Sequence, residues 1–285
     1  MIGQMAVDAI LMGMLYAIVA IGLALIWGVA DIVNFAHGGY LLIAMLSTVY
    51  LTTWLNVDPL LLLPFNTALL FVLGYLSYKY LISKVMSATM LSQILLTFGL
   101  LLVIQHGAFV LVGPSARRVD EYVFSGSMTV QGLTVSQPQV VAGIGCLLTL
   151  AMLGGFLKYS RTGKAIRATA QNWDAARVVG IDPDYVFGVT WGIGIATVGI
   201  AGTFLATIHP VQVEVIPLNW TLIAFAGVAL GGFGNIIAAG LGGLGISFVE
   251  QSGIRWLDSS YRELYIFAVF LLAILARTYI KEVRE

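Results

Sequence analysis

The stretch KYSRTGKAIRATAQNWDAARVVGIDPDY, from Lys158 to Tyr185, is the only long polar stretch in the second half of the chain that also has helical periodicity. It carries five basic residues, and apolar runs flank it on both sides. Its small and apolar residues predict one short amphipathic helix over Ala165–Gly180, which Gly180 and the following Pro183 would end. Because Lys and Arg accumulate in cytoplasmic loops, we place residues 158–184 on the cytoplasmic face of a membrane. There the helix could dock another protein, or it could lie on the lipid surface as an ordinary amphipathic helix.

The composition defines the class of protein around that stretch. Hydrophobic residues make up 59% of the 285 residues, charged residues only 10%, and the mean hydropathy is +0.95. Since a soluble domain carries about 25% charged residues, we expect an all-α polytopic membrane protein whose residues 1–285 form a single transmembrane domain. The net charge of zero argues against a nucleic-acid partner. The first apolar run lacks a basic start and a small-residue cleavage site, so we expect it to remain as a span.

Seven apolar runs are long enough to cross a bilayer of about 30 Å. They cover roughly residues 5–29, 38–56, 60–82, 88–112, 138–157, 185–208 and 262–281, and an interrupted apolar region follows at 219–250. An outer N-terminus leaves four basic residues outside and places ten in the cytoplasm, namely Lys79, Lys84, Lys158, Arg161, Lys164, Arg167, Arg177, Arg277, Lys281 and Arg284. The positive-inside rule therefore favours an outer N-terminus, a cytoplasmic C-terminus and an outer loop over 114–137.

Two apolar runs are interrupted by glycine. Residues 219–250 break at Gly231–Asn235 into two pieces that are each short for a full crossing, so the region is either re-entrant or two short spans with a tight cytoplasmic turn. Residues 28–39 form a similar interruption, and this segment and Gly227–Asn235 both start with Gly-Val-Ala. Irregular backbone at membrane depth must be buried in protein or line a wet cavity, and paired interruptions point to a transport site. We therefore assign Gly232, Gly234 and Asn235 to the translocation path.

The first interruption contains three polar residues, Asp31, Asn34 and His37, at positions i, i+3 and i+6. They would share one face if the segment were helical. An ionised side chain near the bilayer centre costs roughly 2.5–3.5 kcal/mol, so Asp31 should face water or a partner. The three residues could line the substrate path, or they could satisfy broken backbone groups and fix a kink. Our candidate path residues in this segment are Asn34, Phe35, His37 and Gly38.

Two further patterns concern the packing of the spans. Gln93, Thr97 and Gln105 recur at helical spacing on the fourth apolar run, so this polar face should point into the bundle, either as pore lining or as helix–helix hydrogen bonds. We add Gln93 and Thr97 to the candidate path. The glycine-rich faces Gly188–Gly192 and Gly240–Gly245 predict close approach between helices, within this chain or with a second permease.

The residues Asp174-Ala175-Ala176 are followed, after three further residues, by Gly180. This pattern resembles the EAA-x-x-x-G coupling segment of ABC importer permeases. Asp174 stands where that segment usually has Glu. The blocks TGKAIRATAQNWDAARVVGID, GLALIWGVADIVNFAHG and LGGFGNIIAAGLGG extend the resemblance, over nearly the whole chain, to the branched-chain amino acid (LIV-type) ABC permease family. The resemblance implies a type II-like importer permease with about eight transmembrane segments, the broken ones included. It also implies contact with a separate ATPase subunit through Arg167, Gln171, Asp174, Ala175, Ala176 and Gly180.

The chain shows no ATPase motif, because Thr162-Gly163-Lys164-Ala165 lacks the Walker A spacing. We therefore expect no cofactor on this chain, and ATP with Mg²⁺ on partner subunits. The resemblance implies two ATPase subunits, a second and different permease subunit, and an extracytoplasmic substrate-binding protein, at the inner membrane of a bacterial or archaeal cell.

The resemblance implies branched-chain or other hydrophobic amino acids as substrates, and relatives with this architecture also move urea, short amides or aromatic acids. An ion-coupled secondary transporter is the alternative class, although the spans offer few acidic residues to carry ions. No arrangement of residues indicates a catalytic or metal site.

Overall fold

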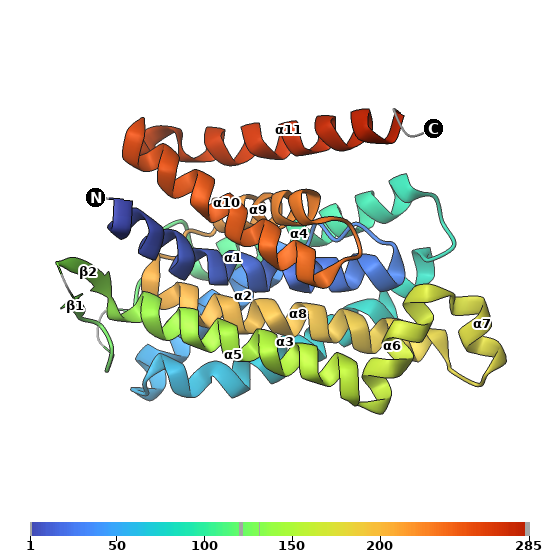
Figure 1. Ribbon diagram of the computed structural model, residues 1–285. Helices are drawn as coiled ribbons and strands as arrows, with labels where there is room; N and C mark the ends of the chain where they lie inside the picture. Colours follow the sequence, from blue (N-terminus) through green and yellow to red (C-terminus); the bar gives the residue numbers. More distant parts are fainter. Residues whose placement is uncertain (1, 120–121, 131, 283–285) are drawn as a thin grey trace.

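The computed structural model describes residues 2–119, 122–130 and 132–282, with the backbone alone for 276–282. Its α-helices are α1 (Ile2–Ala30), α2 (His37–Leu55), α3 (Leu63–Tyr80), α4 (Met90–Val112), α5 (Gln137–Tyr159), α6 (Arg161–Gln171), α7 (Trp173–Val178), α8 (Pro183–Ile208), α9 (Ile216–Gly231), α10 (Ile236–Trp256) and α11 (Arg262–Glu282). Short 3₁₀ helices cover Pro59–Leu62, Ile82–Val85 and Ser259–Tyr261. The long helices run side by side, with α6 and α7 at one end and a small β-hairpin at the other (Figure 1).

The membrane-spanning helices follow the apolar runs closely. Among the described residues, six helices are long and apolar enough to cross a membrane, namely α1, α2, α3 with the 3₁₀ turns on both sides of it, α4, α5 and α8. The bent pair α9–α10 brings the number to at most seven, so the predicted total of about eight is not confirmed. Helix α11 is not among the six. Arg284, one of the ten basic residues behind our orientation, lies outside the described residues.

Helix α1 is the centre of the bundle. Every residue from Leu15 to Ile26 is buried, and the helix packs against α10, α8, α9 and α5. A span that is apolar on all sides is expected at such a position. The glycine-rich faces are used within this chain: a Cβ on Gly243 would lie 2.7 Å from the backbone nitrogen of Ala17 on α1, and one on Gly192 would lie 2.9 Å from the Phe71 ring on α3.

The helices at the edge of the bundle leave apolar surface uncovered. Helix α4 buries only Gln93, Thr97 and Leu101 along its length. Helix α5 is similarly exposed, and it carries Leu147, Leu148 and Met152 on its outer side. These surfaces face lipid or another membrane subunit, because water would be a poor solvent for them.

The region 219–250 is broken where its glycines lie. The axes of α9 and α10 differ by 117°, and Gly232 and Gly234 in the turn have φ values of 124° and 78°. These values favour glycine because a Cβ would clash. A change of direction above 90° rules out one straight span, and α9, with 16 residues, is only about 24 Å long. Helix α10 has 21 residues, so the second piece is longer than a half-span.

The predicted amphipathic helix over Ala165–Gly180 is wrong in one respect, because it is two helices. Asn172 has extended backbone between α6 and α7, and its Oδ1 accepts a hydrogen bond from the Ala175 N–H at 2.9 Å. Asn competes with the helical backbone in this way and so favours caps over helix interiors. Gly180 ends the segment with a φ of 86°, and Pro183 opens α8 at the position where proline is well tolerated.

The segment 114–137 holds the only strands in the described residues. β1 (Ser127–Val130) and β2 (Leu133–Ser136) pair antiparallel, with Ser127 opposite Ser136 and Val130 opposite Leu133. Arg117 bridges Val211 through two backbone hydrogen bonds of 3.0 and 2.7 Å, so this segment is joined to the loop after α8. The fold is therefore all-α apart from one small hairpin.

Candidate functional site

The first interruption is an irregular segment between α1 and α2. Asp31 has a φ of 53°, in the left-handed region, and residues 31–36 are not helical. The condition under which Asp31, Asn34 and His37 would share a helical face is therefore not met. Asp31 is exposed, whereas Asn34 and His37 are fully buried.

Asn34 and His37 both fix the backbone at this break. The Asn34 Oδ1 accepts a hydrogen bond from the Ala36 N–H at 3.1 Å, and the His37 Nε2 lies 3.0 Å from the carbonyl oxygen of Val19 on α1. The remaining side-chain nitrogens, Asn34 Nδ2 and His37 Nδ1, are buried and have no hydrogen-bond partner in the described part of the chain. Such groups are uncommon in native proteins. Both residues thus combine a structural contact with a free hydrogen-bonding atom.

Threonines from two other helices anchor the same break. The Thr97 hydroxyl on α4 donates to the carbonyl oxygen of Val33 at 2.9 Å. The Thr221 hydroxyl on α9 accepts from the Gly38 N–H at 2.9 Å and lies 3.1 Å from the carbonyl oxygen of Phe35. A Cβ on Gly38 would overlap a carbonyl oxygen of α9, so only glycine allows this approach. Helices α2, α4 and α9 therefore meet at the first break.

The second break lies against the end of α1 that leads into the first break. The Phe233 ring is tilted against Trp27 with centroids 4.5 Å apart, and a Cβ on Gly28 would lie 2.9 Å from the Cα of Gly234. Phe225 completes the contact, because its ring lies 6.3 Å from that of Trp27 and 5.1 Å from that of Phe35. The two interruptions that the sequence paired by their glycines are thus neighbours in space. Asn235 has a local role there, since its Oδ1 caps α10 by accepting from the Ala238 N–H at 3.1 Å.

A cavity of about 540 Å³ connects this region with residues 158–184, the predicted coupling segment. Trp27 and Asp31 line it from the end of α1, Gln93 from α4, and Trp173 and Arg177 from α7. Gln93 also holds the turn before α4, because its Nε2 donates to the carbonyl oxygens of Val85 and Met86 at 3.2 and 3.3 Å. One wall of the cavity is therefore candidate translocation path and another is coupling segment.

The coupling segment has one packed side and one free side. On α6, Gly163, Ile166 and Thr169 are buried, and Ile166 packs into a cluster with α1, α5 and α8. Arg167, Gln171, Asp174 and Ala175 are exposed, whereas Ala176 is only 4% exposed. Val178 and Val179 are 87% and 75% exposed. Large exposed apolar side chains beside basic residues are typical of a surface that binds another protein or a membrane surface.

A buried ionic cluster at the other end of the bundle was missed by sequence reasoning. Glu250 on α10, only 1% exposed, forms an ion pair with Arg262 at the start of α11. The Tyr16 hydroxyl on α1 donates to Glu250 at 2.5 Å and accepts from Arg262 Nη2 at 2.9 Å. The only signal in the sequence was a single Glu in an apolar run. Within the described residues, no three His, Cys, Asp or Glu side chains gather closely enough to hold a metal ion.

Comparisons with known proteins agree with this arrangement. The family described as "branched-chain amino acid transport system / permease component" matches residues 5–275. The chain is 27% identical to the high-affinity branched-chain amino acid transport system permease protein LivH of Escherichia coli (strain K12), over 95% of this chain and 92% of LivH. It is 25% identical to the corresponding permease protein BraD of Pseudomonas aeruginosa, over 96% of this chain and 93% of BraD.

An archaeal relative extends the comparison. The chain is 28% identical to the probable branched-chain amino acid transport permease protein LivH of Methanocaldococcus jannaschii, over 89% of this chain and 81% of that protein. No solved structure gives a significant match. The family match covers the chain from the start of α1 into α11, including both breaks and the coupling segment. The chain therefore belongs to the branched-chain amino acid transport permease family.

Proposed function

We propose that this chain is the membrane permease subunit of an ATP-driven importer for branched-chain amino acids. Its curated relatives are named for branched-chain amino acid transport. The observation that carries the proposal is the double role of α7: Trp173 and Arg177 line the cavity that reaches the first break, while Val178 and Val179 lie free on the surface. A protein bound to that surface would act directly on the wall of the cavity.

The packing of α6 supplies the mechanical connection. Ile166 is buried among Ile21 and Leu25 of α1 and Val186 of α8, so displacement of α6 must move these two helices or break their packing. Helix α1 leads directly into the break at residues 31–36. A push on the coupling segment would therefore reach Asn34, His37 and the contact with Gly232–Asn235, where substrate would pass.

The proposed partners follow from the free surfaces and from the family. Two ATPase subunits would carry ATP and Mg²⁺ and bind the coupling segment through Arg167, Gln171, Asp174, Ala175 and Gly180, with Ala176 packed beneath. A second, different permease subunit and lipid would cover α4 and α5. An extracytoplasmic binding protein would deliver substrate near the hairpin β1–β2, with the N-terminus outside and the C-terminus in the cytoplasm of a bacterial or archaeal cell.

The test is copurification of the ATPase subunits with this permease in mild detergent. Val178→Asp places a charge in the proposed contact, so we expect loss of the bound ATPase and of ATP-dependent leucine uptake. Val123→Asp is the matched control, because Val123 is 73% exposed in the segment 114–137 at the opposite end. If Val178→Asp retains the ATPase as well as Val123→Asp does, or if the wild type binds none, the coupling assignment is wrong.

A further inference from the structure

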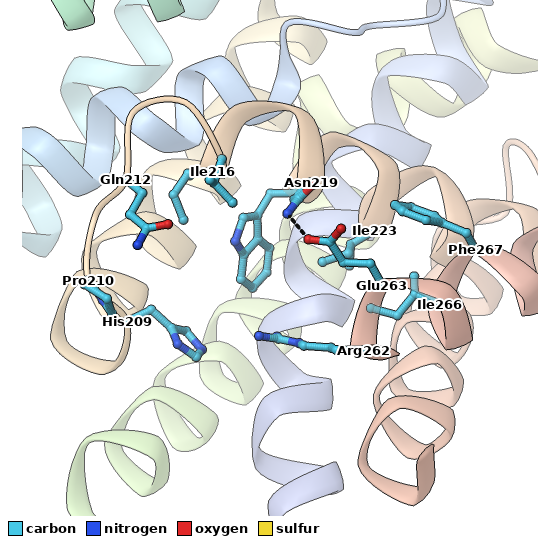
Figure 2. A pocket seen from close by; sticks show the side chains of 12 residues that line it. His209, Pro210, Gln212, Ile216, Asn219, Ile223, Arg262, Glu263, Ile266 and Phe267 are labelled. Atoms are coloured by element: carbon cyan, nitrogen blue, oxygen red, sulfur yellow. Dashed lines mark hydrogen bonds between the residues drawn. The ribbon is translucent and has the colours of Figure 1, made fainter. Parts of the chain in front are cut away.

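A small pocket of about 180 Å³ lies between α9, α11 and the loop that follows α8 (Figure 2). Helix α8 begins beside the coupling segment and has 26 residues, so the loop at its far end is about 39 Å away. In the proposed orientation this is the outer end of the permease. A cavity of about 150 Å³ is large enough for benzene, so this outer pocket has the size for a small organic molecule.

The outer pocket contains a guanidinium group with free donor capacity. Arg262 uses Nε for Glu250 and Nη2 for Tyr16, and within the described residues its Nη1 has no hydrogen-bond partner. The side chain is 37% exposed, so this end of the guanidinium is accessible. The His209 side chain points toward Arg262 across the pocket (Figure 2), and its buried Nε2 has no partner in the described part of the chain. Arg262 Nη1 is a donor, and His209 Nε2 is a second one in the tautomer that carries its proton there, so the pair is suited to a carboxylate.

A carboxylate of the protein lies on the other side of the same pocket. Glu263 is held by Asn219, whose Nδ2 donates to its Oε1 at 2.6 Å, and the second oxygen is left for another donor (Figure 2). Ile216, Ile223, Ile266 and Phe267 also line the pocket. The pocket thus offers an anionic group, a cationic group and a branched apolar surface within a small volume.

We propose that the outer pocket binds an α-amino acid as a zwitterion, with Arg262 and His209 on its carboxylate, Glu263 on its ammonium group, and the isoleucines and Phe267 around its side chain. This inference rests on the proposed function for the choice of branched-chain amino acids. The ion pair with Glu250 and the hydrogen bond to Tyr16 position Arg262, because they engage two of its nitrogens and leave the third free for a ligand.

The test is binding of radiolabelled L-leucine to the permease–ATPase complex in nanodiscs, without the binding protein. Glu263→Gln keeps an acceptor for Asn219 and removes the charge, so we expect affinity for L-leucine and for leucinamide to fall by about tenfold or more. Binding of 4-methylpentanoate, which lacks the ammonium group, should not change. A purely structural role of Glu263 would weaken all three ligands alike.

Glu214→Gln is the matched control, because Glu214 is exposed and does not line the outer pocket. Equal L-leucine affinity in Glu263→Gln and Glu214→Gln would overturn the site. Uptake of L-leucine by the wild-type transporter in proteoliposomes separates the two proposals. Uptake without direct leucine binding overturns the site and leaves the proposed function intact, whereas absence of uptake overturns the proposed function.

Discussion

Gly28 on α1 and Gly234 in the turn between α9 and α10 lie so close together that a Cβ on Gly28 would be 2.9 Å from the Cα of Gly234. Gly28 is two residues before Ala30, where α1 ends and the first break follows. The contact therefore joins the last turn of α1 to the second break backbone to backbone, with no side chain between them. Any rearrangement that opens the first break must either carry the turn with it or separate these glycines.

Gly28→Ala should separate the two breaks by inserting a methyl group into this contact. Overpacking of this kind costs about 1–3 kcal/mol, so we expect a lower melting temperature in detergent and reduced leucine uptake. Gly99→Ala on α4 is the control, because nothing lies within 4 Å of the position that its Cβ would take and alanine is the better helix former. Equal stability and uptake in the two variants would contradict a close contact at Gly28.

Thr97→Val should loosen the anchor between α4 and the first break. The variant keeps the shape of the side chain and removes the hydrogen bond to the Val33 carbonyl, which should lower the free energy of unfolding by about 1 kcal/mol. Thr149→Val on α5 tests whether any threonine has this effect, because the Thr149 hydroxyl bonds only Gly145 in its own helix. Thermal unfolding in nanodiscs compares the two, and an equal loss would show that the tertiary bond of Thr97 contributes nothing.

The positions of the breaks could be predicted from sequence because they depend on local chemistry. Gly232 and Gly234 adopt positive φ values that other residues rarely adopt. The same local reasoning failed at Asn172, where the side chain caps a new helix and splits the coupling segment. An amphipathic pattern continues through such a cap, so periodicity alone does not reveal it.

The ionic cluster of Tyr16, Glu250 and Arg262 could not be predicted, because its contacts join distant parts of the chain. Tyr16 and Glu250 are 234 residues apart and meet only when α1 and α10 pack together. The candidate path residues show the same limit: Asn34 and His37 were chosen because they are polar, yet the carbonyl of Val19 that His37 contacts has no marker in the sequence.

Glu250→Gln should remove the carboxylate that forms the ion pair with the Arg262 guanidinium. Leaving one partner of a fully buried ion pair uncompensated costs about 3–5 kcal/mol, whereas replacing both partners with apolar groups is often close to neutral. Because Arg262 is 37% exposed, solvent screens its charge, so we expect a loss below that range for Glu250→Gln and a still smaller one for the double variant Glu250→Leu with Arg262→Met. A double variant as unstable as the single one would show that the cluster contributes more than charge compensation.

His209 should make the stability of the outer end depend on pH. It lies in the loop just after α8, where burial and then the nearby Arg262 lower its pKa from 6.5 to about 4. Between pH 6.5 and pH 4 the unfolded chain therefore binds a proton at His209 that the folded chain does not bind. The free energy of unfolding is highest above pH 6.5 and decreases as the pH falls toward 4. Glu263 faces the same pocket and would partly offset the charge of the imidazolium. We expect the melting temperature to fall between pH 7 and pH 5, and His209→Gln to flatten that slope.

His106→Gln, on the exposed side of α4, is the control and should keep the wild-type slope. The same slope in His209→Gln as in the wild type would show that His209 is not the group that titrates.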